Sequence, residues 1–189
     1  LKHAGYTVHL GGNIGTPLLP RVDTMTENDL AVVELSSFQL MGMKHSPHIA
    51  AITNLTPNHL DYHKDLDEYV QAKTAIYRNQ GENDKLILNL DDEVTRSLKA
   101  SGNLFCTSKT QELANGVFLK DDVIYIADGG VRRELMPAAD RDSQRNGMAD
   151  QLLHTLVFRG DGHQFDESAG MVHDLIEKTA VRLPDIRRI

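Results

Sequence analysis

The 189-residue chain lacks several features that would assign it to particular classes of protein. It has a single cysteine, Cys106, which cannot build an internal disulfide framework, so a reducing, cytoplasmic location is expected. No stretch reaches the roughly 20 apolar residues of a membrane span, and no signal peptide is recognisable. The formal net charge of −7 argues against a general nucleic-acid binder.

Short apolar runs alternate with segments of helix length through the first part of the chain. The predicted strands are residues 6–10, 30–35, 48–55, 85–90 and 104–107. The run at 30–35 is almost continuously apolar, which is typical of a strand buried on both faces of a parallel sheet. Strands separated in this way predict an α/β fold, with a mostly parallel sheet and crossover helices.

Residues 65–79 predict a helix that Asp65 caps, with Glu68 placed as in a capping box. Lys73 lies in the middle of the apolar stripe of this helix. Its side chain could snorkel to water, which the spacing alone favours. Alternatively, a dry site could lower its pKa and free the amine, which reacts with carbon dioxide to form a carbamate.

The character of the chain changes twice towards its end. Residues 117–119 and 123–126 flank a short polar turn and predict a small β-hairpin region. Beyond residue 140 a polar linker leads to a predicted helix at 167–183. The expected division is therefore a domain at 1–140 and a helical tail of uncertain relation at 141–189.

Three groups of residues could carry chemistry. Glu34 lies near the carboxyl end of a predicted strand, where it could hold a divalent cation or simply cap a turn. His59, Asp61 and His63 follow another strand and could supply metal ligands, although such loops also occur without a metal. The glycine loop at 11–15, with Asn13, could cradle a phosphate or form an ordinary turn, and it is not a GxxxxGK[ST] loop.

Several motifs in one order carry a family resemblance. They are Gly12-Asn13-Ile14-Gly15, the segment ELSSFQL at 34–40, TNLTPNHLD at 53–61, AKTAIY at 72–77 and LNLDD at 88–92. Together they resemble the ATP-dependent Mur ligases of peptidoglycan synthesis, over roughly residues 1–140. Residues 1–140 would then form part of the central ATP-binding domain of that family.

The resemblance implies an ATP-dependent amide ligase. The segment at 34–40 is similar to that of the members that add D-glutamate to UDP-N-acetylmuramoyl-L-alanine. ATP would phosphorylate the L-alanyl carboxylate, and the amine of D-glutamate would displace phosphate from the acyl phosphate. Mg²⁺ would neutralise the phosphoryl oxygens. Neither a nucleic acid nor a membrane is an expected partner.

The resemblance also implies roles for individual residues. Glu34, His59 and Lys73, the last as a carbamate, are the expected catalytic and Mg²⁺-binding residues, so carbamylation of Lys73 becomes the favoured interpretation. Substrate-side positions are expected at Gly12, Asn13, Gly15, Ser36, Ser37 and Gln39. It assigns no firm role to Asp61 or His63.

Departures from the family pattern lead to a further expectation. The phosphate loop, the uridine-nucleotide domain and a convincing C-terminal domain do not appear in this sequence, so the chain is expected to be an inactive fragment of a ligase. Two alternatives stay open: a folylpolyglutamate synthetase-like ligase, and a non-catalytic remnant that only binds or folds.

Overall fold

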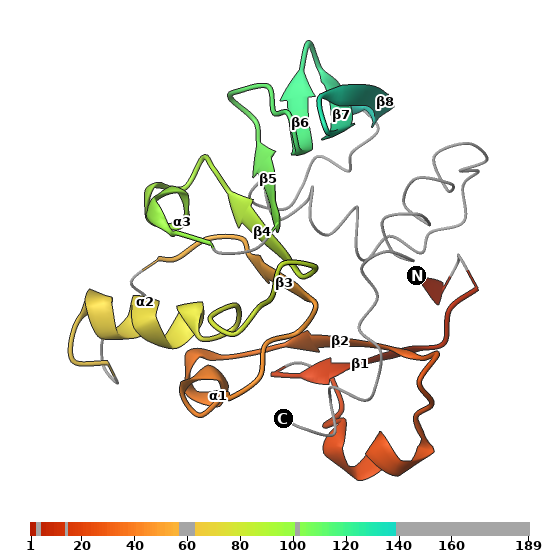
Figure 1. The fold of residues 1–189 in the computed structure, drawn as a ribbon, viewed down its shortest axis with the longest axis vertical. Coiled ribbons are helices and arrows are strands. Elements are labelled where there is room, and N and C mark those ends of the chain that lie inside the picture. The colour runs from red at the N-terminus through yellow and green to blue at the C-terminus, as the bar shows by residue number, and fades with distance from the viewer. Residues whose placement is uncertain (3–4, 14, 57–62, 101–102, 139–189) are drawn as a thin grey trace.

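The protein contains two β-sheets in the part of the chain that is described (Figure 1). The computed structural model describes residues 1–2, 5–13, 15–56, 63–100 and 103–138. The smaller sheet pairs β1 (Val8–Gly12) with β2 (Leu30–Glu34) in parallel. The larger sheet holds, in order, β3 (Ile49–Ile52), β4 (Lys85–Asn89), β5 (Asn103–Ser108), β6 (Gly116–Lys120), β7 (Val123–Asp128) and β8 (Val131–Pro137). Strands β3 to β6 run parallel to one another, β7 runs antiparallel to β6, and β8 runs antiparallel to β7. The predicted, mostly parallel α/β fold is confirmed.

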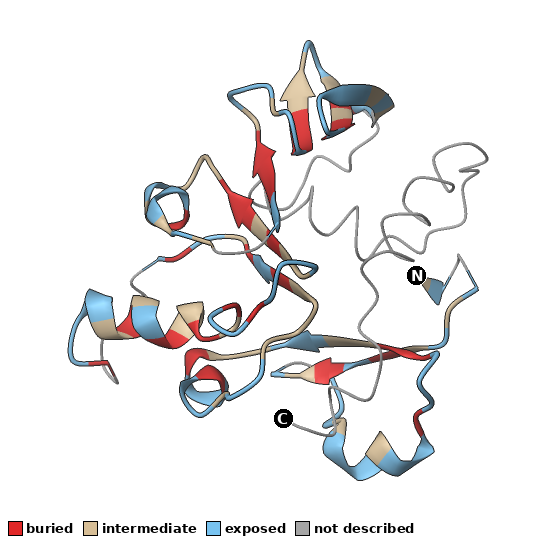
Figure 2. Ribbon diagram, viewed as in Figure 1, coloured by how far each residue is buried: buried red, intermediate tan, exposed pale blue. Residues whose placement is uncertain are grey.

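Short helices connect these strands. They are the 3₁₀ helix η2 (Leu19–Thr24) and the α-helices α1 (Ser37–Met41), α2 (Leu66–Thr74) and α3 (Glu93–Ser97). Buried residues lie along the strands and within α2, where Tyr69 and Ala72 are buried (Figure 2). Ala50 and Ile52 of β3 and Leu86 and Leu88 of β4 form one core with Tyr69 of α2. No helix in the described ranges is long and apolar enough to cross a bilayer.

Helix α2 begins as predicted but ends early. The Asp65 carboxylate accepts a hydrogen bond from the Glu68 N–H (2.9 Å), whereas the Glu68 carboxylate accepts from the Lys64 N–H (2.6 Å) rather than closing a capping box. After Thr74 the backbone bonds run from residue i to i−3, as in Tyr77 N–H to Thr74 O. These tighter turns end the α-helix at Thr74, five residues before the predicted end at 79.

Strand β1 lies two residues later than the predicted strand at 6–10. Gly11 and Gly12 continue it, because they pair with Val33 and Glu34 of β2. Gly12 has φ +107°, and a Cβ there would lie 2.1 Å from the Glu34 carbonyl oxygen. The first two glycines of the predicted loop therefore belong to the sheet, and glycine at position 12 lets two backbones approach closely.

The predicted hairpin is confirmed but is not a separate region. Asp121 and Asp122 both have positive φ, 48° and 58°, as the two-residue turn between β6 and β7 requires. Strand β6 also pairs in parallel with β5, and β7 pairs with the unpredicted β8. The hairpin thus continues the main sheet.

Strand β2 departs from its predicted environment, and β3 has a similar position. Both sequences are apolar enough for an interior strand, yet each strand lies at the end of its sheet. Val33 is 41% exposed, and Ala51 is exposed as well. The prediction that the run at 30–35 is buried on both faces is wrong for this structure, because the side chains of Val33 and Glu34 are exposed.

Cys106 of β5 is buried, at 6% exposure, and burial raises the pKa of its thiol. A raised pKa keeps the thiol protonated and therefore unreactive. We expect a thiol reagent such as DTNB to label it roughly 100-fold more slowly in the native chain than in denaturant, because labelling requires local opening. Equal rates in the two conditions would contradict this burial.

Asp91, which follows β4, ties together the ends of two strands. Its carboxylate accepts hydrogen bonds from the Ser108 hydroxyl (2.7 Å), the Thr110 hydroxyl (2.7 Å) and the Lys109 N–H (2.6 Å). Partial burial opposes ionisation, but these bonds outweigh it and hold the pKa of Asp91 below its ordinary value.

Asp91→Asn is therefore expected to lower the free energy of unfolding at pH 7 by about 1–3 kcal/mol, because an amide cannot accept all three bonds. The folded-state pKa is the lower one, so this stabilisation is complete above about pH 5 and is lost as the pH falls through the folded-state value. Urea unfolding of both proteins should converge at the lowest pH at which both still fold. A gap that stays constant with pH would contradict the assignment.

Candidate active site

The carboxyl ends of β1 and β2 place Asn13 against Glu34. The Asn13 side-chain amide donates to Glu34 Oε1 (3.0 Å), and the Asn13 N–H donates to the Glu34 carbonyl oxygen (2.8 Å). Glu34 is exposed, and its second carboxylate oxygen has no hydrogen bond of this kind among those the structure describes. The turn therefore presents an acid at the edge of the sheet where α/β proteins bind ligands.

Lys73 of α2 points back towards this turn. Its ammonium donates to the Leu35 carbonyl oxygen (3.4 Å) and lies 5.9 Å above the centre of the Tyr69 ring. Burial lowers the pKa of the Lys73 amine, and the negative charge of Glu34 opposes that shift. The structure thus brings Lys73 and Glu34 into one electrostatic environment, with Lys73 half-buried rather than extended into water.

The residues expected around the substrate begin α1. The Ser36 hydroxyl accepts from the Gln39 N–H (3.4 Å), and Gln39 Oε1 accepts from the Ser36 N–H (2.9 Å), so the two form a capping box. Ser37 is buried, at 2% exposure. Gly15 lies exposed in the loop after Asn13. The two capping side chains therefore fix where the turn after Glu34 ends.

His59 and Asp61 lie outside the described residues, so the structure places neither of them. His63 is described; its position after a strand made it a possible metal ligand, and the family resemblance assigns it no firm role. Its ring is buried beneath the turn after β2, and its Nε2 lies 2.9 Å from the Ser37 hydroxyl. No sequence signal pointed to this contact, because the two residues are 26 positions apart.

The side chains near Glu34 are suited to binding a magnesium ion. The described ranges contain no group of three His, Cys, Asp or Glu side chains that could hold a metal. Glu34 nevertheless offers an exposed carboxylate oxygen, the hard ligand that Mg²⁺ prefers. A carbamate on Lys73 would add anionic oxygens near it, so the residues present fit the ion.

Comparisons with known proteins identify the family to which these residues belong. A family profile described as "Mur ligase middle domain" matches residues 4–135. The chain is 45% identical over 142 residues to a UDP-N-acetylmuramoylalanine–D-glutamate ligase of Acetivibrio thermocellus, covering 74% of this chain and 30% of that one. It is 48% identical over 128 residues to the ligase of the same name from Ruminiclostridium cellulolyticum, covering 67% and 28%.

Among solved structures, a MurF from Acinetobacter baumannii aligns with a TM-score of 0.43 at 16% identity, covering 96% of this chain and 44% of that one. The chain spans less than a third of the length of the two D-glutamate ligases from Acetivibrio thermocellus and Ruminiclostridium cellulolyticum.

Proposed function

Because the chain belongs to the Mur ligase family, whose middle domain it matches over residues 4–135, we propose that it is part of an ATP-dependent ligase. The complete protein would join D-glutamate to UDP-N-acetylmuramoyl-L-alanine in peptidoglycan synthesis. The observation that carries this proposal is the 45–48% identity to ligases named for that reaction. We further propose that the protein acts in the cytoplasm, and that residues 1–140 contribute to its ATP-binding domain and 141–189 form a tail.

The proposed reaction has two steps. The L-alanyl carboxylate attacks the γ-phosphorus of ATP, ADP leaves, and an acyl phosphate forms. The amine of D-glutamate then attacks the acyl carbon, the C–O bond to phosphate breaks, and the amine loses a proton. Bound Mg²⁺ would supply neutralising charge for the phosphoryl oxygens.

The residues proposed to hold Mg²⁺ are Glu34, His59 and Lys73 as its carbamate. A carbamate forms when the neutral amine attacks carbon dioxide, a C–N bond forms, and the nitrogen releases a proton to water. The lowered pKa of Lys73 supports this step, because it raises the fraction of neutral amine. The exposed carboxylate of Glu34, oriented by Asn13, supports a cation at the same place.

On the substrate side we propose Gly12, Asn13, Gly15, Ser36, Ser37 and Gln39. Asn13 is tied to Glu34 by two hydrogen bonds, so a substrate group bound at Asn13 would lie close to the proposed cation. Ser36 and Gln39 cap α1, so their backbone groups define the neighbouring surface. Ser37, which is buried, would support that surface from beneath.

A substrate panel on the complete protein tests this proposal. ATP, Mg²⁺, UDP-N-acetylmuramoyl-L-alanine and D-glutamate should release phosphate and yield the amide. Activity with a folate and L-glutamate instead would indicate a folylpolyglutamate synthetase-like ligase. No activity, together with no shift in melting temperature under saturating nucleotide substrate and Mg²⁺, would indicate a non-catalytic remnant, because a bound ligand stabilises the fold.

A further inference from the structure

A buried imidazole lies between the turn after β2 and helix α2, and the proposed chemistry does not use it. His63 is 3% exposed. Its ring stacks on Phe38 of α1, with centroids 5.5 Å apart and planes 15° from parallel. The same ring meets Tyr69 of α2 edge-on, at 5.4 Å between centroids. His63 therefore contacts both elements that flank the candidate site.

These contacts connect His63 indirectly to the amine of Lys73. The ring of Tyr69 touches His63 and also lies beneath the Lys73 ammonium. The carbonyl of Leu35 accepts from Lys73, and two residues later Ser37 bonds with His63. Two groups thus contact the Lys73 amine: the Tyr69 ring, which His63 contacts directly, and the Leu35 carbonyl, which lies two residues before a partner of His63.

The hydrogen bonding of His63 selects one tautomer. Its Nδ1 is buried with no hydrogen-bond partner in the described structure, and Nε2 is 2.9 Å from Ser37 Oγ. A proton on Nδ1 would be a buried donor without an acceptor, which folded proteins rarely tolerate. The proton therefore lies on Nε2, and His63 donates to the Ser37 hydroxyl.

We propose that His63 is a positioning residue for the amine of Lys73, acting through Ser37 and Tyr69; this inference rests on the function proposed above. His63 holds the turn after β2 against α2, so that the Leu35 carbonyl and the Tyr69 ring fix the amine from two sides.

The first test measures carbamate formation in the full 189-residue chain by ¹³C NMR with ¹³C-bicarbonate at fixed pH. Loss of the bond in Ser37→Ala, and of the ring in His63→Leu, is expected to weaken carbon dioxide binding at Lys73 about tenfold, as removal of a supporting partner does at metal sites. His63→Gln is expected to restore most of it, because its amide nitrogen can replace Nε2 as a donor to Ser37. Equal carbamate formation in His63→Leu and the wild type would overturn the proposal.

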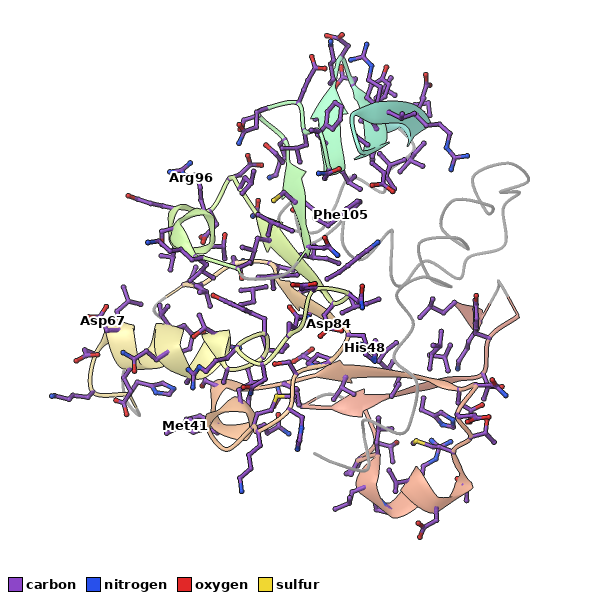
Figure 3. All side chains as sticks on the ribbon, in the orientation of Figure 1. Met41, His48, Asp67, Asp84, Arg96 and Phe105 are labelled. Atoms are coloured by element: carbon purple, nitrogen blue, oxygen red, sulfur yellow. The ribbon has the colours of Figure 1, made fainter. Side chains whose placement is uncertain are left out.

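A matched control separates positioning from stability. His48 bonds with Asp84 beside the start of β4, at the end of the sheet away from the carboxyl edge (Figure 3). His48→Leu makes the same substitution at this second histidine and should leave the Lys73 carbamate unchanged, even where it lowers the melting temperature. A loss in His48→Leu equal to that in His63→Leu would overturn the positioning role.

Two further readouts distinguish failure of this inference from failure of the proposed function. Long-range ¹H–¹⁵N NMR should show the His63 proton on Nε2, and a proton on Nδ1 would overturn the proposal. If the wild type forms no carbamate, the proposed modification fails, and reductive methylation decides on positioning. Lys73 should then methylate several-fold faster in His63→Leu than in the wild type, relative to exposed Lys99, and an unchanged ratio would overturn the inference.

Discussion

Replacing Lys73 with alanine in the complete ligase is expected to lower kcat by more than about 100-fold, because the loss of a metal ligand should exceed the 10- to 100-fold cost of losing its supporting partner. The amine is half-buried, held by the Leu35 carbonyl, and within the field of Glu34. A carbamate there converts a cation into an anionic oxygen ligand. Alanine removes that ligand and leaves Glu34 to face any cation with fewer oxygen partners.

Phosphate release measured with all three substrates gives kcat for each variant. Formate or acetate should restore part of the activity of Lys73→Ala, since a small carboxylate can occupy the vacated space and supply oxygens. Lys73→Arg is the control, because it keeps the positive charge and cannot form a carbamate. Near-normal turnover in Lys73→Arg, or no rescue of Lys73→Ala, would exclude the carbamate mechanism.

Gly116→Ala is expected to lower the free energy of unfolding by more than about 4 kcal/mol, a loss at the extreme end for one substitution. Gly116 begins β6 with φ +144°, and a Cβ there would lie 2.0 Å from the Cys106 carbonyl oxygen. An alanine must therefore move β6 away from β5. The first residues after it, Val117 and Phe118, are fully buried, so that movement would also open the core.

Gly129→Ala is the matched control for strain without a clash. Gly129 also has positive φ, 58°, but no atom lies within 4 Å of the Cβ it would gain. The left-handed conformation alone should cost about 1 kcal/mol. Urea unfolding of the 189-residue chain measures both variants. Similar losses in the two would show that backbone conformation, rather than contact with Cys106, makes glycine necessary at 116.

Local sequence patterns predicted most strands well. The runs at 30–35 and 85–90 end within a residue of β2 and β4, and Asp65 caps α2 as expected. The errors have physical reasons. The glycines of β1 resemble a loop in sequence but pair with β2 where two backbones approach closely. Helix α2 is shorter than predicted because tighter i to i−3 turns follow Thr74, a change that the apolar spacing does not reveal.

The site was predictable only where sequence neighbours create it. Glu34 at a strand end and Lys73 within an apolar stripe both stand out by position, and the structure brings them together, while their chemical roles stay predictions. Its position after a strand marked His63 as a possible metal ligand, but not as the positioning residue proposed above. That role depends on contacts with Ser37, Phe38 and Tyr69, which only the fold brings together.

The two apolar strands at the ends of the sheets have a consequence for how the chain behaves in solution. Backbone amides on the outer sides of β2 and β3 lack ladder partners in the described structure, whereas β4 and β5 are bonded on both sides. Deuterium should therefore enter β2 and β3 sooner than β4 and β5. Unprotected edges of this kind also recruit extended segments from other molecules, so the isolated chain should self-associate as its concentration rises, most readily where charge repulsion is screened by salt.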